Sequence, residues 1–193
     1  LASNYSMATF ATTGDITPLA VTVTAVTDTK VYDGTTSSSA SPTVGPLATG
    51  DAVLTAPVQV FDTKDAGSGK TLTASGLTIK DENNVDVTSN YSISYVSNTT
   101  GVISQKSLTA ATTVASKVYD GSPAAGAVTL GTVTGLVGTE TLVITATASD
   151  YANANVGTGK ETTISYALAD GTNGGLASNY SMATFATTGD ITP

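Results

Sequence analysis

Apolar and polar residues alternate with a period of two over many short segments of this chain. The clearest segment is residues 21–26, VTVTAV. Such alternation places every second side chain on one face of a strand, and β-branched residues favour that geometry. No segment shows a convincing helical stripe, although residues 136–141 have room for one short turn. The pattern predicts strands at 21–26, 58–61, 72–79, 91–96, 101–104, 108–114, 127–133, 142–148, 162–168, 180–185 and 190–192.

Turn sequences rich in Gly, Asn and Asp separate these segments. Asp33-Gly34, Asn83-Asn84 and Asp170-Gly171 are examples, and they favour turns because these residues tolerate positive φ or bond their own backbone. Short strands with turns about every 8–12 residues indicate an all-β sandwich or barrel. We expect Ig-like β-sandwich modules in tandem. A β-grasp-like sheet is the alternative, because composition does not separate the two.

The two ends of the sequence are identical. Residues 1–18 recur letter for letter as residues 176–193. Identity over such a length indicates a tandem array, and arrays of like modules usually act through length and multiplicity. We expect residues 1–18 to be the closing strands of a preceding repeat. An isolated hairpin is marginal in water, so we expect this segment to dock on the start of the next module or on a neighbouring molecule.

The long repeat is itself double. Three motifs occur twice in the same order, each separated by just under ninety residues: KVYDG at 30–34 and 117–121, GxGK at 67–70 and 157–160, and SNYS at 89–92 and 178–181. A domain of that size can bury one core without covalent crosslinks. We therefore predict a first module over residues 19–105 and a second over residues 106–193.

Each KVYDG motif follows a predicted strand and has a simple structural interpretation. The Asp caps its own turn, the Gly supplies a positive φ, and the Tyr anchors the strand end in the core with its hydroxyl in solvent. The residues concerned are Tyr32, Asp33, Gly34, Tyr119, Asp120 and Gly121.

A second set of tyrosines follows Asn at the start of a late strand. We expect Tyr5, Tyr91 and Tyr180 to act as tyrosine corners, with the ring packed and the hydroxyl bonded to backbone. An aromatic platform for sugars is the functional alternative, and it is disfavoured because the chain has no Trp.

The joint occurrence of K-V-Y-D-G, G-x-G-K and N-Y-S in fixed order resembles the YDG domain repeats of large bacterial adhesins and filamentous-haemagglutinin-type surface proteins. The resemblance covers nearly the whole of both modules. The first module departs from the family pattern at residues 40–57 and 81–84. The resemblance implies extracellular β-rich spacers in a long surface protein, with no catalysis to carry over.

Composition narrows the possible chemistry. The chain has no Cys and no His, and its seven basic residues are all Lys, so thiolate metal sites, the commonest general base and the bidentate phosphate clamp are absent. We expect no enzyme activity and no cofactor. The net charge of −8 is spread evenly and disfavours nucleic acid and anionic lipid. No apolar run approaches the roughly 20 residues of a membrane span, so we expect no membrane insertion.

Two weaker hypotheses concern ion binding and crosslinking. Oxygen ligands for Ca²⁺ gather at Asp81, Glu82, Asn83 and Asp86, although the spacing is not that of an EF-hand loop. A solvated turn is the alternative. Lys30 and Lys117 lie at strand ends and are candidates for an isopeptide crosslink to Asn90 or Asn179, which requires a Lys neutralised by burial. An exposed Lys beside Asp is the alternative.

These observations favour a non-catalytic stalk or spacer in a secreted or cell-surface bacterial adhesin. Its partners would be neighbouring repeats of the same chain, and it would project a distal binding domain. The alternative is an adhesive module that binds host or matrix glycan or protein weakly and gains avidity from copy number.

Overall fold

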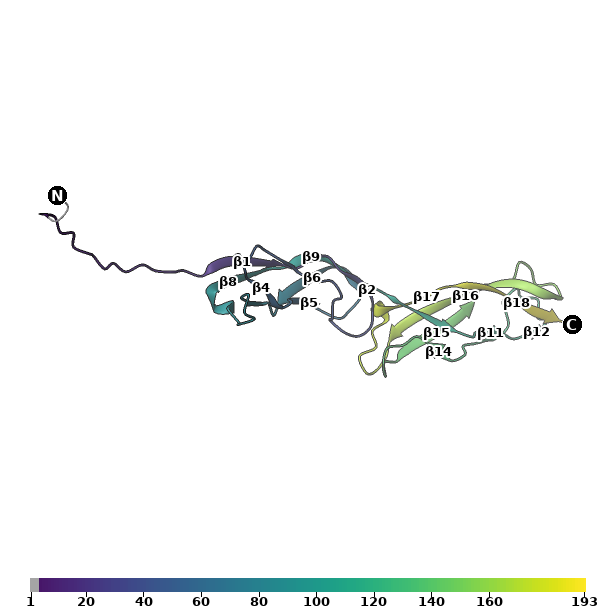
Figure 1. The fold of residues 1–193 in the computed structure, drawn as a ribbon. Helices are drawn as coiled ribbons and strands as arrows, with labels where there is room; N and C mark the ends of the chain where they lie inside the picture. Colours follow the sequence, from purple (N-terminus) through teal and green to yellow (C-terminus); the bar gives the residue numbers. More distant parts are fainter. Residues whose placement is uncertain (1–3) are drawn as a thin grey trace.

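A computed structural model describes residues 4–193 and shows an elongated, all-β molecule (Figure 1). Two β-rich units lie end to end, and an N-terminal arm extends away from them. We call residues 19–105 module 1 and residues 106–193 module 2. The described residues contain no α-helix; short 3₁₀ turns include η2 (Thr88–Asn90) and η3 (Ala177–Asn179). The all-β prediction is confirmed.

Module 1 contains nine strands in three small sheets. The sheet orders are β3-β1-β8, β2-β9-β6-β5 and β4-β7. The strands are β1 (Leu19–Thr24), β2 (Thr29–Val31), β3 (Thr43–Val44), β4 (Ala52–Thr55), β5 (Val58–Phe61), β6 (Gly67–Ser75), β7 (Thr78–Lys80), β8 (Tyr91–Val96) and β9 (Asn98–Ser104).

Module 2 repeats this plan with two longer strands. Its sheet orders are β14-β10-β17, β11-β13 and β12-β18-β16-β15. The strands are β10 (Lys106–Ala110), β11 (Thr113–Val114), β12 (Lys117–Val118), β13 (Val128–Thr129), β14 (Val133–Thr134), β15 (Leu142–Ala148), β16 (Gly157–Asp170), β17 (Tyr180–Met182) and β18 (Phe185–Thr192).

Strands near the start of each module run parallel to strands near its end. In module 1, β1 pairs with β8 from Leu19–Tyr91 onward, and β2 pairs with β9 up to Val31–Ser104. In module 2, β10 pairs with β17 and β12 with β18 in the same sense. The chain therefore enters a module at one end and leaves it at the opposite end. Successive modules extend along a line, as Figure 1 shows.

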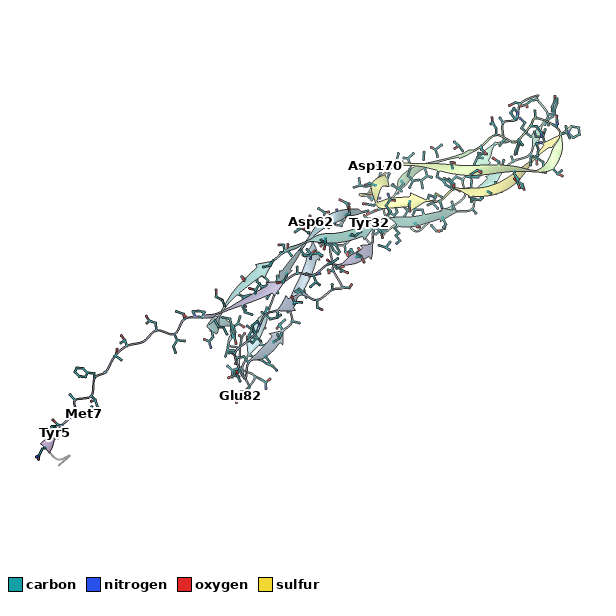
Figure 2. The ribbon with its side chains drawn as sticks, turned by 90° about the horizontal axis from the view of Figure 1, so that it is seen from above. Tyr5, Met7, Tyr32, Asp62, Glu82 and Asp170 are labelled. Carbon is teal, nitrogen blue, oxygen red and sulfur yellow. The ribbon has the colours of Figure 1, made fainter. Side chains whose placement is uncertain are left out.

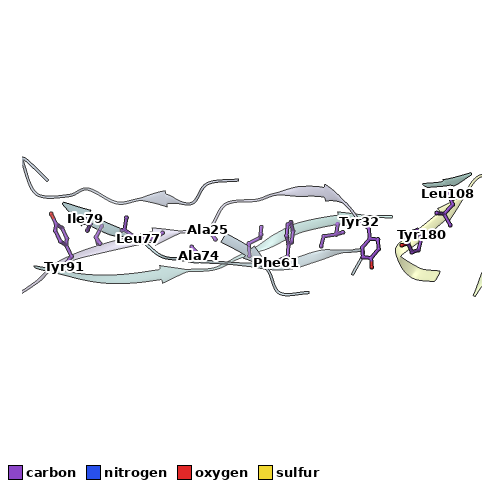
Figure 3. Close-up of a cluster of buried hydrophobic side chains, with 13 residues drawn as sticks. Ala25, Tyr32, Phe61, Ala74, Leu77, Ile79, Tyr91, Leu108 and Tyr180 are labelled. Atoms are coloured by element: carbon purple, nitrogen blue, oxygen red, sulfur yellow. The ribbon is translucent and has the colours of Figure 1, made fainter. Parts of the chain in front are cut away.

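The core follows the period-two pattern. Val21 and Val23 of β1 are buried while Thr22 between them is exposed. Burying each such side chain stabilises the fold by roughly 1.5–3 kcal/mol. Figure 3 shows the buried row along module 1, which continues to Tyr180 of module 2. The largest fully buried hydrophobic side chains are those of Tyr32, Phe61, Leu72, Ile79, Ile103, Ile164, Ile191 and Val23.

Residues 4–18 extend away from module 1, with side chains in solvent (Figures 1 and 2). Tyr5, Met7, Phe10 and Ile16 are 84–101% exposed. The expectation that this segment docks on module 1 is therefore wrong for the described residues. The identical sequence in module 2 forms η3, β17 and β18, which pair with β10, β12 and β16. Module 1 already has β8 and β9 in those positions, so residues 4–18 have no strand to pair with.

Candidate functional site

The first YDG turn lies at the end of module 1 that faces module 2. The Asp33 carboxylate accepts a hydrogen bond from the Thr35 amide at 2.8 Å and forms an ion pair with Lys30 Nζ at 2.8 Å. Gly34 has a φ of 79°, which favours Gly because a Cβ is strained there. Asp33 thus caps the turn and Gly34 supplies its positive φ. The turn holds Tyr32 at the tip of the module.

Tyr32 reaches across the junction to module 2. Its hydroxyl donates to Glu140 Oε1 at 2.7 Å, and the hydroxyl of Tyr180 donates to Glu140 Oε2 at 2.6 Å. The two rings meet edge to face with centroids 5.4 Å apart, a geometry that aromatic pairs prefer. Figure 3 shows Tyr32 and Tyr180 facing each other where the modules meet.

The side chains of Tyr32, Tyr180 and Glu140 are all buried. Tyr32 is 1%, Tyr180 2% and Glu140 8% exposed. The sequence-based expectation of a solvated Tyr32 hydroxyl is wrong, because the carboxylate of the next module replaces water as its hydrogen-bond acceptor. Figure 2 shows Tyr32 at this junction.

A second group of contacts surrounds the tyrosines. Asn179 is completely buried; its Nδ2 donates to Asp65 Oδ1 at 2.9 Å, and its Oδ1 accepts from the Ala66 amide at 2.8 Å. Lys64 Nζ lies 3.5 Å from Glu140 Oε1. Both polar ends of the buried amide are thus satisfied by module 1, as buried polar groups require.

The pKa values of the acid and the two tyrosines favour the hydrogen bonds between them. Burial alone would raise the pKa of Glu140, but hydrogen bonds from Tyr180 and Tyr32 and the charge of Lys64 hold its pKa below the usual value. Burial and the adjacent carboxylate raise the pKa of both tyrosines to about 12. Hydrogen bonds to an ionised group are stronger than neutral ones. The carboxylate therefore stays charged and both hydroxyls stay protonated around neutral pH.

Tyr180 and Tyr91 both have the geometry of a tyrosine corner. The Val137 amide donates to the Tyr180 hydroxyl and the Ala48 amide donates to the Tyr91 hydroxyl, each at 3.0 Å. Tyr91 in turn donates to Asp51 Oδ2 at 2.6 Å. Tyr5 lies in the exposed arm and makes no corner. These corners hold the loops that carry Asp51 and Glu140.

The proposed calcium ligands form one turn of module 1. Asp81 Oδ1 accepts hydrogen bonds from the amides of Asn83 and Val85, and Asp86 Oδ1 accepts from the Thr88 amide; Glu82 is exposed. Over residues 4–193, no group of three or more acidic, His or Cys side chains is arranged to hold a metal ion. The carboxylates act as caps of their own turn, and Ca²⁺ binding stays a prediction.

The two candidate crosslinking lysines pair with the acid of their own YDG turn. Lys117 Nζ lies 2.8 Å from Asp120 and bonds the Ser122 carbonyl, as Lys30 bonds Asp33 and the Thr35 carbonyl. Within each module, the suggested Asn partner precedes β8 or β17, at the end opposite the turn. The structure does not bring the lysine and that Asn together within either module.

Sequence reasoning missed Glu140, Asn179, Asp65 and Lys64 as a set. Glu140 stands where Asp51 stands in module 1, three residues after the amide that bonds the corner tyrosine. Aligning the two modules therefore identifies an acid at this position. Its second partner, Tyr32, belongs to the other module, so the spacing of residues within one module does not predict this contact. The arrangement ties two modules together through a buried polar cluster.

Comparison with protein families gives one match, found twice. The model of the YDG domain matches residues 17–100 and residues 104–188. Comparisons with curated proteins and with solved structures find no significant match. The part of the chain that the structure describes contains no helix that could span a lipid bilayer. Two matches that together span most of the sequence show that this chain belongs to the YDG domain family.

Proposed function

We propose that the chain is a non-catalytic structural segment, a stalk or spacer in a secreted or cell-surface bacterial adhesin that projects a distal binding domain. The observation that carries this proposal is the buried contact of Tyr32 with Glu140 and Tyr180. A buried, hydrogen-bonded junction between consecutive modules is what a chain requires to keep a fixed direction over several units.

The covalent connection supports the same conclusion. Strand β9 ends at Ser104 and β10 begins at Lys106, so Gln105 alone separates the modules. Its Nε2 donates to the Ser178 carbonyl of module 2 at 3.1 Å. Modules joined by flexible linkers move relative to one another by default. A one-residue connection that is itself bonded to the next module opposes that motion.

For each module we infer an Ig-like sandwich rather than a β-grasp. The division of each module into several small sheets supports this assignment. A β-grasp sheet packs around a helix, and residues 4–193 contain no α-helix. The strands run along the long axis of the module (Figure 1), and each residue adds about 3.3 Å to its length.

An extracellular location fits the composition. The chain has no Cys and carries a net charge of −8, so its stability does not depend on redox state and its acidity opposes self-aggregation. We propose neighbouring repeats of the same chain as the main partners of each module.

Small-angle X-ray scattering of the chain in solution tests the proposal. We expect an extended particle whose maximum dimension falls, or whose flexibility rises, when Glu140→Ala removes the junction acid. A compact particle would contradict the spacer role. Specific binding on a glycan array would favour the alternative of an adhesive module that acts by avidity.

A further inference from the structure

The outer end of module 1 repeats the inner end of module 2. Both ends present a tyrosine corner whose hydroxyl accepts a backbone amide at 3.0 Å and donates to a carboxylate at 2.6 Å. In module 2 this end receives Tyr32. We call the end of module 1 the open socket; it is formed by Asp51, Asn90, Tyr91 and Ala48, which correspond to Glu140, Asn179, Tyr180 and Val137.

The open socket lacks the cover that its counterpart has. Asp51 is half-buried and Asn90 is exposed, whereas Glu140 and Asn179 are buried. A hollow of about 460 Å³ lies over Asp51, Asn90 and Tyr91, and it is also lined by residues 16–18 at the end of the arm. Within the described part of the chain, Asp51 accepts a side-chain hydrogen bond only from Tyr91. The corner and the acid are in place, and the second tyrosine is missing.

The outer end of module 2 carries the matching tyrosine. The Tyr119 amide donates to the Thr192 carbonyl at 2.9 Å, as the Tyr32 amide donates to the Ser104 carbonyl at 2.9 Å. Gly121 has the same φ of 79° as Gly34. Yet Tyr119 is 54% exposed and Tyr32 is 1% exposed. We call Tyr119 and its turn, with Asn155 and Val156 beside it, the free tip.

The sequence also fits the two ends together. Thr192-Pro193 is identical to Thr17-Pro18, which leads into Leu19 at the start of β1. If two copies follow each other directly, Pro193 of the first precedes Leu19 of the second. A single residue, Pro193, then separates β18 of one copy from β1 of the next, as Gln105 separates β9 from β10. The spacing that seats Tyr32 on module 2 is then reproduced for Tyr119 and module 1.

We propose that the open socket of module 1 binds the free tip of module 2 of a second copy that directly precedes it in a tandem chain. In this contact the Tyr119 hydroxyl donates to Asp51, and Asn90 pairs with Asn155 and the Val156 amide, as Asn179 pairs with Asp65 and the Ala66 amide. Ala154 stands in the position of Lys64, so this junction has no ion pair to its acid. The inference deepens the proposed spacer function and rests on it.

The test uses two complete copies in one chain, residues 1–193 followed directly by residues 19–193. Because the protein has no Cys, single Cys substitutions at exposed strand positions accept spin labels without background. Labels at Thr145 of the first copy and Thr73 of the second copy span the central junction. Labels at Thr73 and Thr145 of one copy span the Tyr32 junction and serve as the reference. Electron–electron resonance then gives the distribution of distances across each junction.

We expect one narrow distance distribution across the central junction, comparable to the reference. Tyr119→Ala in the first copy should broaden the distance distribution across the central junction and leave the reference distribution of that copy unchanged. Tyr32→Ala in the first copy should broaden the reference distribution of that copy and leave the central distribution unchanged. Tyr119 is exposed in the single chain, so its substitution does not remove a core residue, and a melting curve of the single-chain variant verifies this.

A central distribution that is broad in the unsubstituted tandem, or that ignores Tyr119→Ala, would overturn the docking proposal. In that case a narrow reference distribution would still support the spacer function. A broad reference distribution would instead count against the spacer function itself. The two failures are thereby distinguished in one experiment.

Discussion

Glu140 and Asp51 occupy the same position in the two modules, yet Glu140 accepts hydrogen bonds from two tyrosines and Asp51 from one. The difference arises from the neighbour across the junction and not from the modules themselves. It provides matched pairs of residues in which one member reports on the junction and the other on the module alone.

The first prediction concerns this acid. Glu140→Gln turns one acceptor oxygen into an amide donor that faces a tyrosine hydroxyl in a buried site. We expect a loss of about 1–3 kcal/mol in the free energy of unfolding, the range for an unsatisfied buried polar group. Asp51→Asn, at a half-buried position with one partner, should cost less. Urea unfolding monitored by circular dichroism measures both, and equal losses would contradict the role assigned to the junction.

The second prediction separates the two YDG tyrosines. Tyr32→Phe keeps the ring but removes the hydroxyl that donates to Glu140 Oε1. A cost of about 1–3 kcal/mol is expected because the buried carboxylate loses a donor. Tyr119→Phe in the single chain should change stability by no more than about 0.5 kcal/mol, as is usual at exposed positions. Thermal unfolding midpoints of the two variants decide the matter; a similar shift in both would refute the assignment.

The third prediction uses the two turn glycines. Gly34→Ala and Gly121→Ala both place an alanine at a φ of 79°, which costs about 1–2 kcal/mol. Only at Gly34 does the added Cβ fall 2.9 Å from Val137 Cγ1 of module 2. We therefore expect Gly34→Ala to be the more destabilising of the two in denaturant titrations. If Gly121→Ala were the more destabilising, the packing of module 2 against the Gly34 turn would not contribute to stability.

The fourth prediction concerns alkaline pH. Tyr32 and Tyr180 have a folded-state pKa of about 12 against a reference value of 10.0, so the unfolded chain releases their protons first. Their contribution to stability is complete below pH 10 and is lost as the pH rises through about 12. Thermal unfolding between pH 9 and 12 should show this decline. Tyr32→Phe should have a shallower decline, and an unchanged slope would speak against ionisation at the junction.

Much of the fold is encoded in local sequence. Strands predicted at 58–61, 91–96 and 142–148 have those bounds in the structure. In β5 the period-two pattern buries Gln59 and Phe61 and leaves Val58 and Val60 exposed. Residues 127–133, predicted as one strand, contain only β13 (Val128–Thr129) and the first residue of β14 (Val133–Thr134). Gly131 interrupts them and approaches the Ala111 backbone so closely that a Cβ would clash. Single-sequence patterns do not report such backbone approaches.

Residues 4–18 show the limit of local sequence most directly. Their sequence is that of β17 and β18 with the preceding turn, but they lie extended in solvent. Strand formation there depends on β10, β12 and β16, which are distant in sequence. The junction is non-local in the same way, since the hydrogen bond from Tyr32 to Glu140 joins residues 108 positions apart.

The parallel first and last strands also determine how a module responds to tension. A pull on Leu19 at one end and on Ser104 at the other draws β1 and β2 lengthwise past β8 and β9. The hydrogen bonds of these ladders then carry the load together in shear, instead of opening one after another as in a zipper. We therefore expect that unfolding a module by force requires many bonds to break at once, so that a chain of such modules extends little under tension.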